Sequence, residues 1–234
     1  MKVDKNIEAA NSAWTFDAIG DDFESHIEKS IPHYIEWQEL ICQLSDFFLN
    51  PDCLVYDIGA ATGALSRKLA KWNEHRTGMR IVGIDSVESM VKKAQELNTD
   101  PRVTFIHEDL RVFDFEPCSM VMSYYTVQFI HPHYRQQLID RIYESLHWGG
   151  ALILFEKVRG ADARFQDIQS QLYVDFKQKN GFSTDEIIGK SRSLKGVLEP
   201  FSTEGNLGLL QRAGFSDIMP VARWMCFEGL LAIK

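Results

Sequence analysis

Cysteine is scarce in this sequence and widely scattered. The chain has four cysteines, at Cys42, Cys53, Cys118 and Cys226. Because none of them forms a C-x-x-C pair, neither a zinc site nor a disulfide framework is indicated. We expect buried thiols in a reducing cytoplasm. The neighbouring His131 and His133 have no further ligands nearby in the sequence, so we predict no metal site.

Long apolar runs and a positive charge excess are also missing. No run approaches the length of a membrane span, and the first stretch, MKVDKNIEAANSAW, lacks the apolar core of a signal peptide. We therefore expect a cytoplasmic protein without membrane association. The net charge of −8 disfavours direct nucleic-acid binding by electrostatic wrapping. With 234 residues and 45% hydrophobic content, the chain suits one large α/β domain or a domain with an appendage.

Short apolar runs alternate with amphipathic segments from about residue 50 to 158. This spacing implies crossover connections, and hence a parallel sheet with helices on both faces. The predicted strands span 53–58, 80–84, 103–107, 119–123 and 151–156. The predicted helices between them span 64–72, 87–97 and 133–146.

The flanking segments complete the predicted fold. A helical lead-in covers 23–48, a helical insert covers 162–179, and a helix at 207–214 precedes strands at 217–223 and 226–233. We predict a doubly wound, mostly parallel seven-stranded α/β sheet with an antiparallel C-terminal hairpin and a helical N-terminal lid. The predicted division is a lid at 1–49 and a catalytic domain at 50–234, with a helical insert at 160–200.

Small residues follow the first strand in VYDIGAATG, where Gly59, Ala60, Ala61 and Gly63 form the turn. Ligands of doubly wound sheets bind at the carboxyl ends of the strands, and glycine there lets a ligand approach the backbone. A tight turn without a ligand is the alternative. The spacing departs from the G-x-G-x-x-G motif, which weakens a dinucleotide interpretation.

Acidic residues follow the next two strands. Asp85 in VGIDS suits the ribose diol of a nucleoside, although Asp85 or Ser86 equally suits a helix N-cap. Asp109 in HEDL, with its adjacent backbone N–H, suits the edge of an adenine, or a loop position without a ligand. Three such features after successive strands favour a nucleoside site.

Sequence motifs along the chain resemble a known family. VYDIGAATG, VGIDS, HEDL, SMVMSYYTVQFI and LHWGGALILFEK are similar to the motifs of class I S-adenosylmethionine-dependent methyltransferases. WTFD, KSIPHY, DFKQKNGFS and KSRS extend the likeness over nearly the whole chain. They resemble the carboxy-S-adenosylmethionine synthase family, whose product serves wobble-uridine modification in tRNA.

The resemblance implies S-adenosylmethionine, or its carboxylated form, as cofactor and a homodimer as assembly. The implied cofactor contacts are Tyr34, Gly59, Ala60, Ala61, Asp85, Ser86, Asp109 and Leu110. Tyr124 stands where the family has an asparagine contact, and we add Gly63 from the glycine-containing turn. Leu209 aligns with the family arginine that binds the extra carboxylate, and Arg212 does not replace it. A leucine cannot pair with a carboxylate, so we expect methyl transfer in preference to synthase chemistry.

Three functional hypotheses remain. The first is methyl transfer to an unidentified small-molecule acceptor, with the catalytic candidates Tyr124, Tyr125, His131 and Glu156 near the carboxyl edge of the sheet. The tyrosines equally suit core packing, and His131 a loop. The second is a carboxy-S-adenosylmethionine synthase that uses a carboxyl donor such as prephenate, with Arg192 and Arg223 as candidate partners of the donor. The third is a non-catalytic S-adenosylmethionine-binding subunit.

Overall fold

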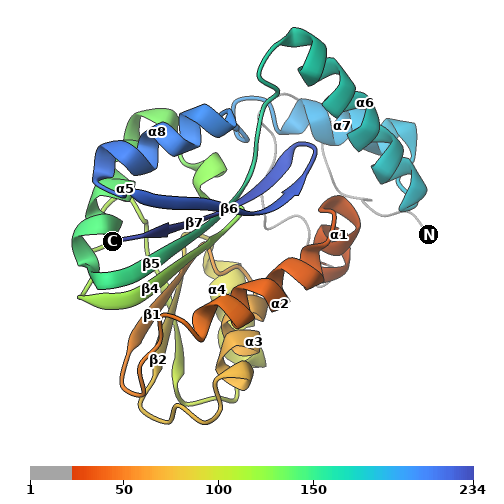
Figure 1. The fold of residues 1–234 in the computed structure, drawn as a ribbon. Coiled ribbons are helices and arrows are strands. Elements are labelled where there is room, and N and C mark those ends of the chain that lie inside the picture. The colour runs from red at the N-terminus through yellow and green to blue at the C-terminus, as the bar shows by residue number, and fades with distance from the viewer. Residues whose placement is uncertain (1–22) are drawn as a thin grey trace.

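The computed structural model describes residues 23–234, so the WTFD motif at 14–17 lies outside the described residues. A seven-stranded sheet runs through the molecule in the order β3-β2-β1-β4-β5-β7-β6 (Figure 1). Its strands are β1 (Leu54–Ile58), β2 (Arg80–Asp85), β3 (Val103–His107), β4 (Cys118–Tyr124), β5 (Leu146–Lys157), β6 (Asp217–Trp224) and β7 (Phe227–Ile233). β1 to β5 pair in parallel, whereas β7 is antiparallel to both β5 and β6. The predicted fold class is therefore confirmed.

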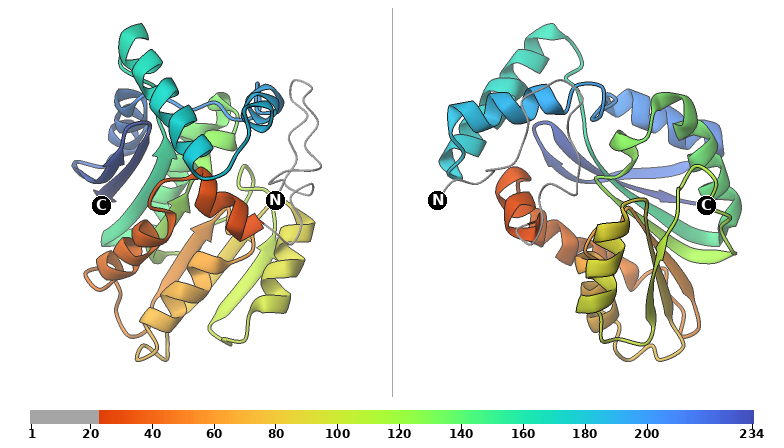
Figure 2. Two further views of the ribbon diagram at one scale, coloured as in Figure 1. Left: turned by 90° about the vertical axis from the view of Figure 1, so that its right-hand side faces the viewer. Right: turned by 180° about the vertical axis from the view of Figure 1, so that it is seen from behind.

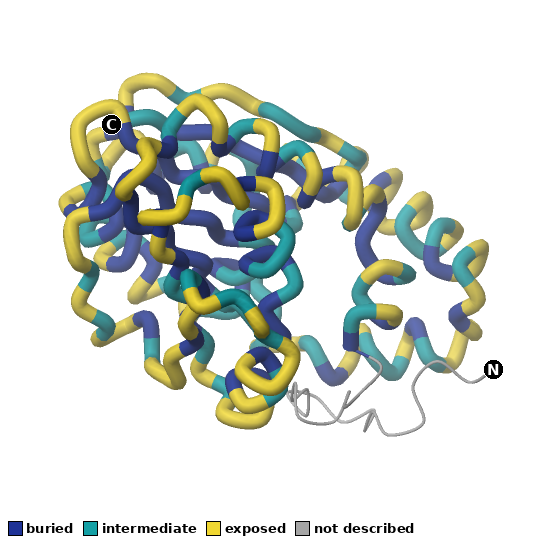
Figure 3. The backbone as a smooth tube through the Cα atoms, turned by 90° about the horizontal axis from the view of Figure 1, so that it is seen from below, coloured by how far each residue is buried: buried dark blue, intermediate teal, exposed yellow. Residues whose placement is uncertain are grey.

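Helices cover both faces of the sheet (Figures 1 and 2). One face carries α2 (Tyr34–Ser45), α3 (Ala64–Trp72) and α4 (Glu88–Leu97), and the other carries α5 (Pro132–Ser145) and α8 (Thr203–Ala213). Because strand side chains alternate between faces, Val55 packs in the first cluster and Tyr56 in the second. The buried residues are concentrated in the central sheet and on the helix faces that cover it (Figure 3). Within residues 23–234, no helix is long and apolar enough to cross a membrane.

The lead-in is two helices, where the sequence predicted one. α1 (Phe23–Ser30) ends before α2 begins at Tyr34. Between them, Pro32 lacks the N–H that would continue a helix, and His33 adopts a left-handed backbone with φ of 56°. The break turns α1 away from α2 and toward the insert that follows β5 (Figure 1).

The insert also holds two helices, α6 (Ala163–Lys179) and α7 (Thr184–Ser193), which project beyond the carboxyl ends of the parallel strands (Figure 1). Asp162 caps α6 by accepting a hydrogen bond from the backbone N–H of Phe165. α7 begins with a capping box between Ser183 and Glu186. α7 lies within the predicted helical insert at 160–200, but the only helix delimited there was 162–179, although S-T-D-E is the local signature of a capping box.

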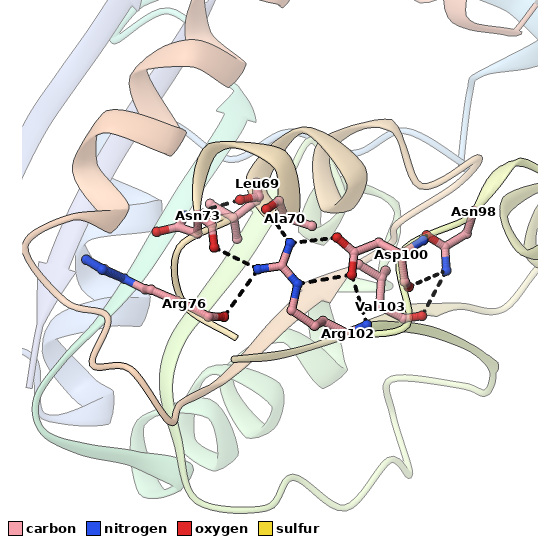
Figure 4. Close-up of polar contacts among 8 residues, drawn as sticks. All are labelled: Leu69, Ala70, Asn73, Arg76, Asn98, Asp100, Arg102 and Val103. Atoms are coloured by element: carbon pink, nitrogen blue, oxygen red, sulfur yellow. Dashed lines mark hydrogen bonds and ion pairs between the residues drawn. The ribbon is translucent and has the colours of Figure 1, made fainter. Parts of the chain in front are cut away.

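At the other end of the strands, Arg102 precedes β3 and joins the loop before β3 to the end of α3 (Figure 4). Its guanidinium donates to the carbonyl oxygens of Ala70 and Asn73, each at 2.7 Å, at the end of α3. It also pairs with Asp100 at 2.6 Å. A cation at a helix C-terminus satisfies carbonyls that have no partner within the helix. The amino end of β3 is thus held to the C-terminal end of α3.

Candidate active site

A cavity of about 660 Å³ lies at the carboxyl ends of the parallel strands. It is lined by loops after β1, β2, β3, β4 and β5, and by residues of α1, α6 and α7. Side chains of the insert hold α1 in place, since the Tyr173 hydroxyl donates to the carbonyl of Ser30 at 3.0 Å. Asn180 donates to the carbonyl of Lys29 at 3.1 Å. The volume and position suit a small-molecule site.

The glycine-containing turn forms one wall of the cavity through Gly59, Ala60 and Ala61. Gly59 has a φ of 70°, and a Cβ there would lie 2.2 Å from Oγ1 of Thr126. Ala61 also has a positive φ, of 47°, which is uncommon for a residue with a side chain. The small residues are therefore needed for the path of the backbone as well as for access of a ligand.

Gly63 was predicted to contact the cofactor, but it does not line the cavity. It is the N-cap of α3, with a φ of 77°. A Cβ at this position would lie 2.3 Å from Cζ of Phe105. Its close packing against β3 and its left-handed backbone account for the glycine without a ligand.

Asp85 lines the cavity with Ser86 and has hydrogen-bond partners of its own. One carboxylate oxygen accepts from the backbone N–H of Ala61 at 2.9 Å, and the other accepts from Val87 at 2.9 Å. Burial raises the pKa of Asp85, and these two donors act in the opposite direction. Asp85 thus fixes the glycine-containing turn, while its ribose contact stays a prediction.

Asp109 and Leu110 line the cavity after β3. Nε of Arg111 lies 2.8 Å from one oxygen of Asp109, and the ion pair lowers the pKa of this carboxyl. The predicted adenine amino group would therefore share the Asp109 carboxylate with Arg111. Leu110 is buried and packs in the cluster that also contains the inner face of α5.

Tyr34, Tyr124 and Tyr125 form an aromatic wall of the cavity. The ring centroids of Tyr34 and Tyr124 lie 5.0 Å apart, and those of Tyr124 and Tyr125 lie 4.8 Å apart. The Tyr124 hydroxyl donates to the carbonyl of Tyr34 at 2.6 Å. Tyr125 has a φ of 66°, and its buried hydroxyl has no hydrogen-bond partner within residues 23–234. Such a combination of backbone strain and an unsatisfied hydroxyl is typical of functional positions.

Two predicted catalytic residues do not line the cavity. His131 is the N-cap of α5, where Nδ1 accepts from the backbone N–H of His133 at 3.2 Å. Glu156 is 3% exposed and lies in the sheet directly opposite Glu228. Burial raises the pKa of Glu156 to about 8, against the opposing effect of Arg135. The structure therefore brings the tyrosines to the cavity, but not His131 or Glu156.

The position of Leu209 does not support the argument for methyl transfer that was based on it. Leu209 is 3% exposed and packs in the hydrophobic cluster between α8, α5 and the sheet. It does not line the cavity, so an arginine at this position would point into the core. Arg212 instead donates to Gln136 at 2.7 Å. The leucine therefore says nothing about which cofactor the site prefers.

The two arginines considered for the donor also lie outside the cavity. Arg192 is exposed on α7, and Arg223 pairs with Glu228. Two lysines that the sequence analysis missed, Lys157 and Lys177, line the cavity in their place. Lys157 ends β5, and its position at a carboxyl end was the signal that could have found it. Lys177 carries no such signal, because it comes from the insert.

Asp57 is a further residue that the prediction left out. It lines the cavity, is 2% exposed, and accepts a hydrogen bond from the Ser66 hydroxyl at 2.6 Å. Burial raises the pKa of Asp57 to about 6, and the charge of Asp85 contributes to the increase. Two acidic side chains therefore shape the potential at the β1–β2 end of the cavity.

Comparison with solved structures supports the fold. The apo form of the S-adenosylmethionine-dependent methyltransferase SibL matches with a TM-score of 0.60 and 15% identity, over 84% of this chain and 54% of SibL. A family model for a methyltransferase domain matches residues 55–150. The matched range includes the glycine-containing turn, Asp85 and Asp109. It also includes Tyr124 at the end of β4 and Tyr125 in the loop that follows.

Comparison with curated proteins reaches across the whole chain. The carboxy-S-adenosyl-L-methionine synthase of Staphylococcus epidermidis is 36% identical over 223 residues, covering 94% of this chain and 97% of that protein. The protein of the same name from Pseudomonas putida is 34% identical, covering 90% of this chain and 88% of that protein. Identity of this extent also covers the insert that completes the cavity. The chain belongs to the carboxy-S-adenosyl-L-methionine synthase family, within the S-adenosylmethionine-dependent transferases of the class I methyltransferase fold.

Proposed function

We propose that this protein is a carboxy-S-adenosylmethionine synthase that takes its carboxyl group from a donor of the prephenate class. One observation carries the proposal: a single cavity is acidic at one end and cationic at the other. Asp57, Asp85 and Asp109 line the first end. Among residues 23–234, the second end is lined by one acidic residue, Glu199, and by Lys157, Arg159, Lys177, Lys190 and Lys195.

The charge distribution favours a second substrate that is an anion. S-adenosylmethionine carries a positive sulfonium, which neighbouring ammonium groups repel. The carboxylate of the cofactor itself can pair with one such cation, and a methyltransferase for a neutral acceptor has no use for the others. A carboxylate-bearing donor, in contrast, would supply an anion to Lys157 and Lys177, which have no carboxylate partner within residues 23–234, and would be held near the methyl carbon. The full-length likeness to proteins named carboxy-S-adenosyl-L-methionine synthase points to the same chemistry.

The proposed reaction balances without an oxidant or a reductant. Prephenate loses carbon dioxide and its ring hydroxyl as the ring becomes aromatic, which yields phenylpyruvate. The departing hydroxide takes a proton from the S-methyl carbon and becomes water. A carbon–carbon bond then forms between that methyl carbon and the carbon dioxide. In this scheme the protein aligns donor and methyl group and excludes water.

Incubation of the purified protein with S-adenosylmethionine and prephenate tests the proposal. Mass spectrometry should detect carboxy-S-adenosylmethionine and phenylpyruvate in equal amounts, and only when both substrates are present. The mass of any cofactor that copurifies provides a second readout. Absence of the carboxylated product from a folded protein that binds S-adenosylmethionine would refute the proposal.

The two other hypotheses correspond to different outcomes of the same experiment. A methyltransferase would produce S-adenosylhomocysteine in the presence of a suitable small-molecule acceptor. A non-catalytic subunit would bind S-adenosylmethionine and leave it unchanged. The missing arginine at position 209 was the argument for methyl transfer, and that argument does not hold because Leu209 lies in the core.

We also propose a cytoplasmic homodimer whose product serves tRNA wobble-uridine modification, as the family resemblance implies. The exposed side of α6 supports the dimer, since Phe165, Ile168 and Leu172 repeat at helical spacing and are 54%, 44% and 42% exposed. Light scattering at micromolar concentration should give twice the monomer mass of 26.9 kDa. A monomeric mass would contradict the proposed assembly.

A further inference from the structure

Two lysines from distant parts of the chain meet at one aromatic ring inside the cavity. Nζ of Lys157, at the end of β5, lies 4.3 Å from the centroid of the Tyr173 ring. Nζ of Lys177, one turn after Tyr173 on α6, lies 4.4 Å from the same centroid. The ring is itself fixed, because the Tyr173 hydroxyl donates to the carbonyl of Ser30. Both ammonium groups are thus positioned on one rigid support.

Among the described residues, the two ammonium groups have no anionic partner. Within residues 23–234, neither takes part in an ion pair or a hydrogen bond to a carboxylate, and aromatic rings are their recorded contacts. Lys177 is only 8% exposed. An ammonium group removed from water without a counter-charge destabilises a fold. A pair of them in one cavity therefore points to a ligand that supplies the missing negative charge.

Titration of the two lysines agrees with this geometry. Burial lowers the pKa of both side chains, and for Lys177 the pKa falls to about 8, with the charge of Lys157 contributing. The other ionisable groups that act on them are Arg159 and Cys226. Lys177 is thus still mainly protonated at pH 7. A bound anion would raise its pKa again.

We propose that Lys157 and Lys177, held at the Tyr173 ring, form a two-cation subsite that binds the two carboxylates of the carboxyl donor. This inference rests on the proposed function and adds the requirement that the donor be a dianion. A monocarboxylate would leave one buried ammonium without a partner, so the subsite should discriminate against it. The donor prephenate carries two carboxylates, and phenylpyruvate, the product formed from it, carries one. The subsite would therefore hold the donor and release its product.

Replacement of each lysine by methionine tests the subsite. Lys177→Met and Lys157→Met keep an unbranched side chain of similar length and remove the charge. Lys179→Met, on the same helix but exposed and away from the cavity, is the matched control. For each protein we would measure KM and kcat with prephenate and the affinity for S-adenosylmethionine alone. Calorimetric titration of the S-adenosylmethionine complex with malonate, a simple dicarboxylate, measures anion binding without turnover.

The expected results separate a binding role from a structural one. Loss of one charge-assisted contact should raise the KM for prephenate roughly tenfold to a hundredfold and weaken malonate binding similarly. The affinity for S-adenosylmethionine alone should be unchanged or higher, since a cation near the sulfonium is removed. The melting temperature of Lys177→Met should equal or exceed that of the wild type. Lys179→Met should behave as the wild type in every measurement.

Each contrary result has a distinct meaning. An unchanged KM and unchanged malonate affinity in both methionine variants would overturn the subsite while leaving the synthase function standing. A loss of affinity for S-adenosylmethionine alone would also overturn it, because the lysines would then bind the carboxylate of the cofactor. If the wild type does not convert prephenate but binds malonate through the lysines, the proposed function fails and the dianion subsite stands.

Discussion

The clearest test of the glycine-containing turn is Gly59→Ala, because the structure offers a matched control for backbone strain. Gly59 and Gly149 have similar positive φ angles, of 70° and 79°. A Cβ at Gly59 would lie 2.2 Å from Oγ1 and 2.4 Å from Cγ2 of Thr126. A Cβ at Gly149 would meet no atom within 4 Å. The two alanine variants therefore share the strain and differ in the steric overlap.

The structure gives the expected size of each effect. A left-handed backbone costs an alanine about 1 kcal/mol, so Gly149→Ala should lower the free energy of unfolding by about that amount. Overpacking typically adds roughly 1–3 kcal/mol, which gives about 2–4 kcal/mol for Gly59→Ala. The displaced turn carries Ala61, whose backbone N–H binds Asp85. We therefore expect S-adenosylmethionine affinity to fall roughly tenfold to a hundredfold in Gly59→Ala alone.

Urea unfolding and calorimetry of the two variants measure both effects. Adding Thr126→Ala to Gly59→Ala removes the two nearest atoms, so the double variant should recover part of the lost stability. Equal destabilisation by Gly59→Ala and Gly149→Ala would refute the steric argument. Unchanged cofactor affinity in a folded Gly59→Ala protein would show that the turn does not contact the cofactor.

Four further substitutions test individual site and core residues. Asp85→Ala should weaken S-adenosylmethionine binding by roughly 2–4 kcal/mol, because it removes the proposed ribose contact and releases the N–H of Ala61; calorimetry that finds wild-type affinity in a folded variant contradicts the assignment. Burial raises the pKa of Glu156 from 4.5 to about 8 in the folded protein. Between these two pH values Glu156 is protonated in the folded state and ionised in the unfolded state. The free energy of unfolding should therefore fall as the pH rises from 4.5 to 8. Glu156→Gln should remove this fall, which urea midpoints at pH 5 and pH 8 would measure; parallel pH dependence in the two proteins argues against it. Leu209→Arg should lower the free energy of unfolding by about 3 kcal/mol or more without tightening the binding of the carboxylated cofactor, and tighter binding would return position 209 to the site. Tyr125→Phe removes a buried hydroxyl that has no hydrogen-bond partner in the described part of the chain. The thermal stability of the ligand-free protein should therefore be unchanged or higher while kcat falls, and a wild-type kcat would exclude a role of this hydroxyl in turnover.

Much of this protein was predictable from local sequence. Short apolar runs separated by amphipathic helical segments predicted the parallel strands. The predicted strand at 103–107 coincides with β3, and the predicted helix at 64–72 coincides with α3. Local patterns succeed here because β1 and β4 are buried on both faces and give continuous apolar runs, whereas α3 is buried on one face and shows helical spacing, so the hydrophobic period follows the structure. The cavity position of the small residues after Asp57 follows equally from their place at a strand end.

The tertiary structure decided which polar side chains share the cavity. His131 and Glu156 were catalytic candidates because of their place near strand ends, and Leu209 was aligned with a family arginine. Their side chains instead cap a helix or lie buried. Lys157 and Lys177 are twenty residues apart in the sequence and meet at one ring because α6 carries Tyr173 and Lys177 to the end of β5. No local pattern encodes that return, since it depends on how the insert packs against α1 and the sheet. The sequence by itself determined the sheet and the glycine-containing turn, because both follow from local patterns. Long-range packing of the insert decided which charged side chains line the other end of the cavity.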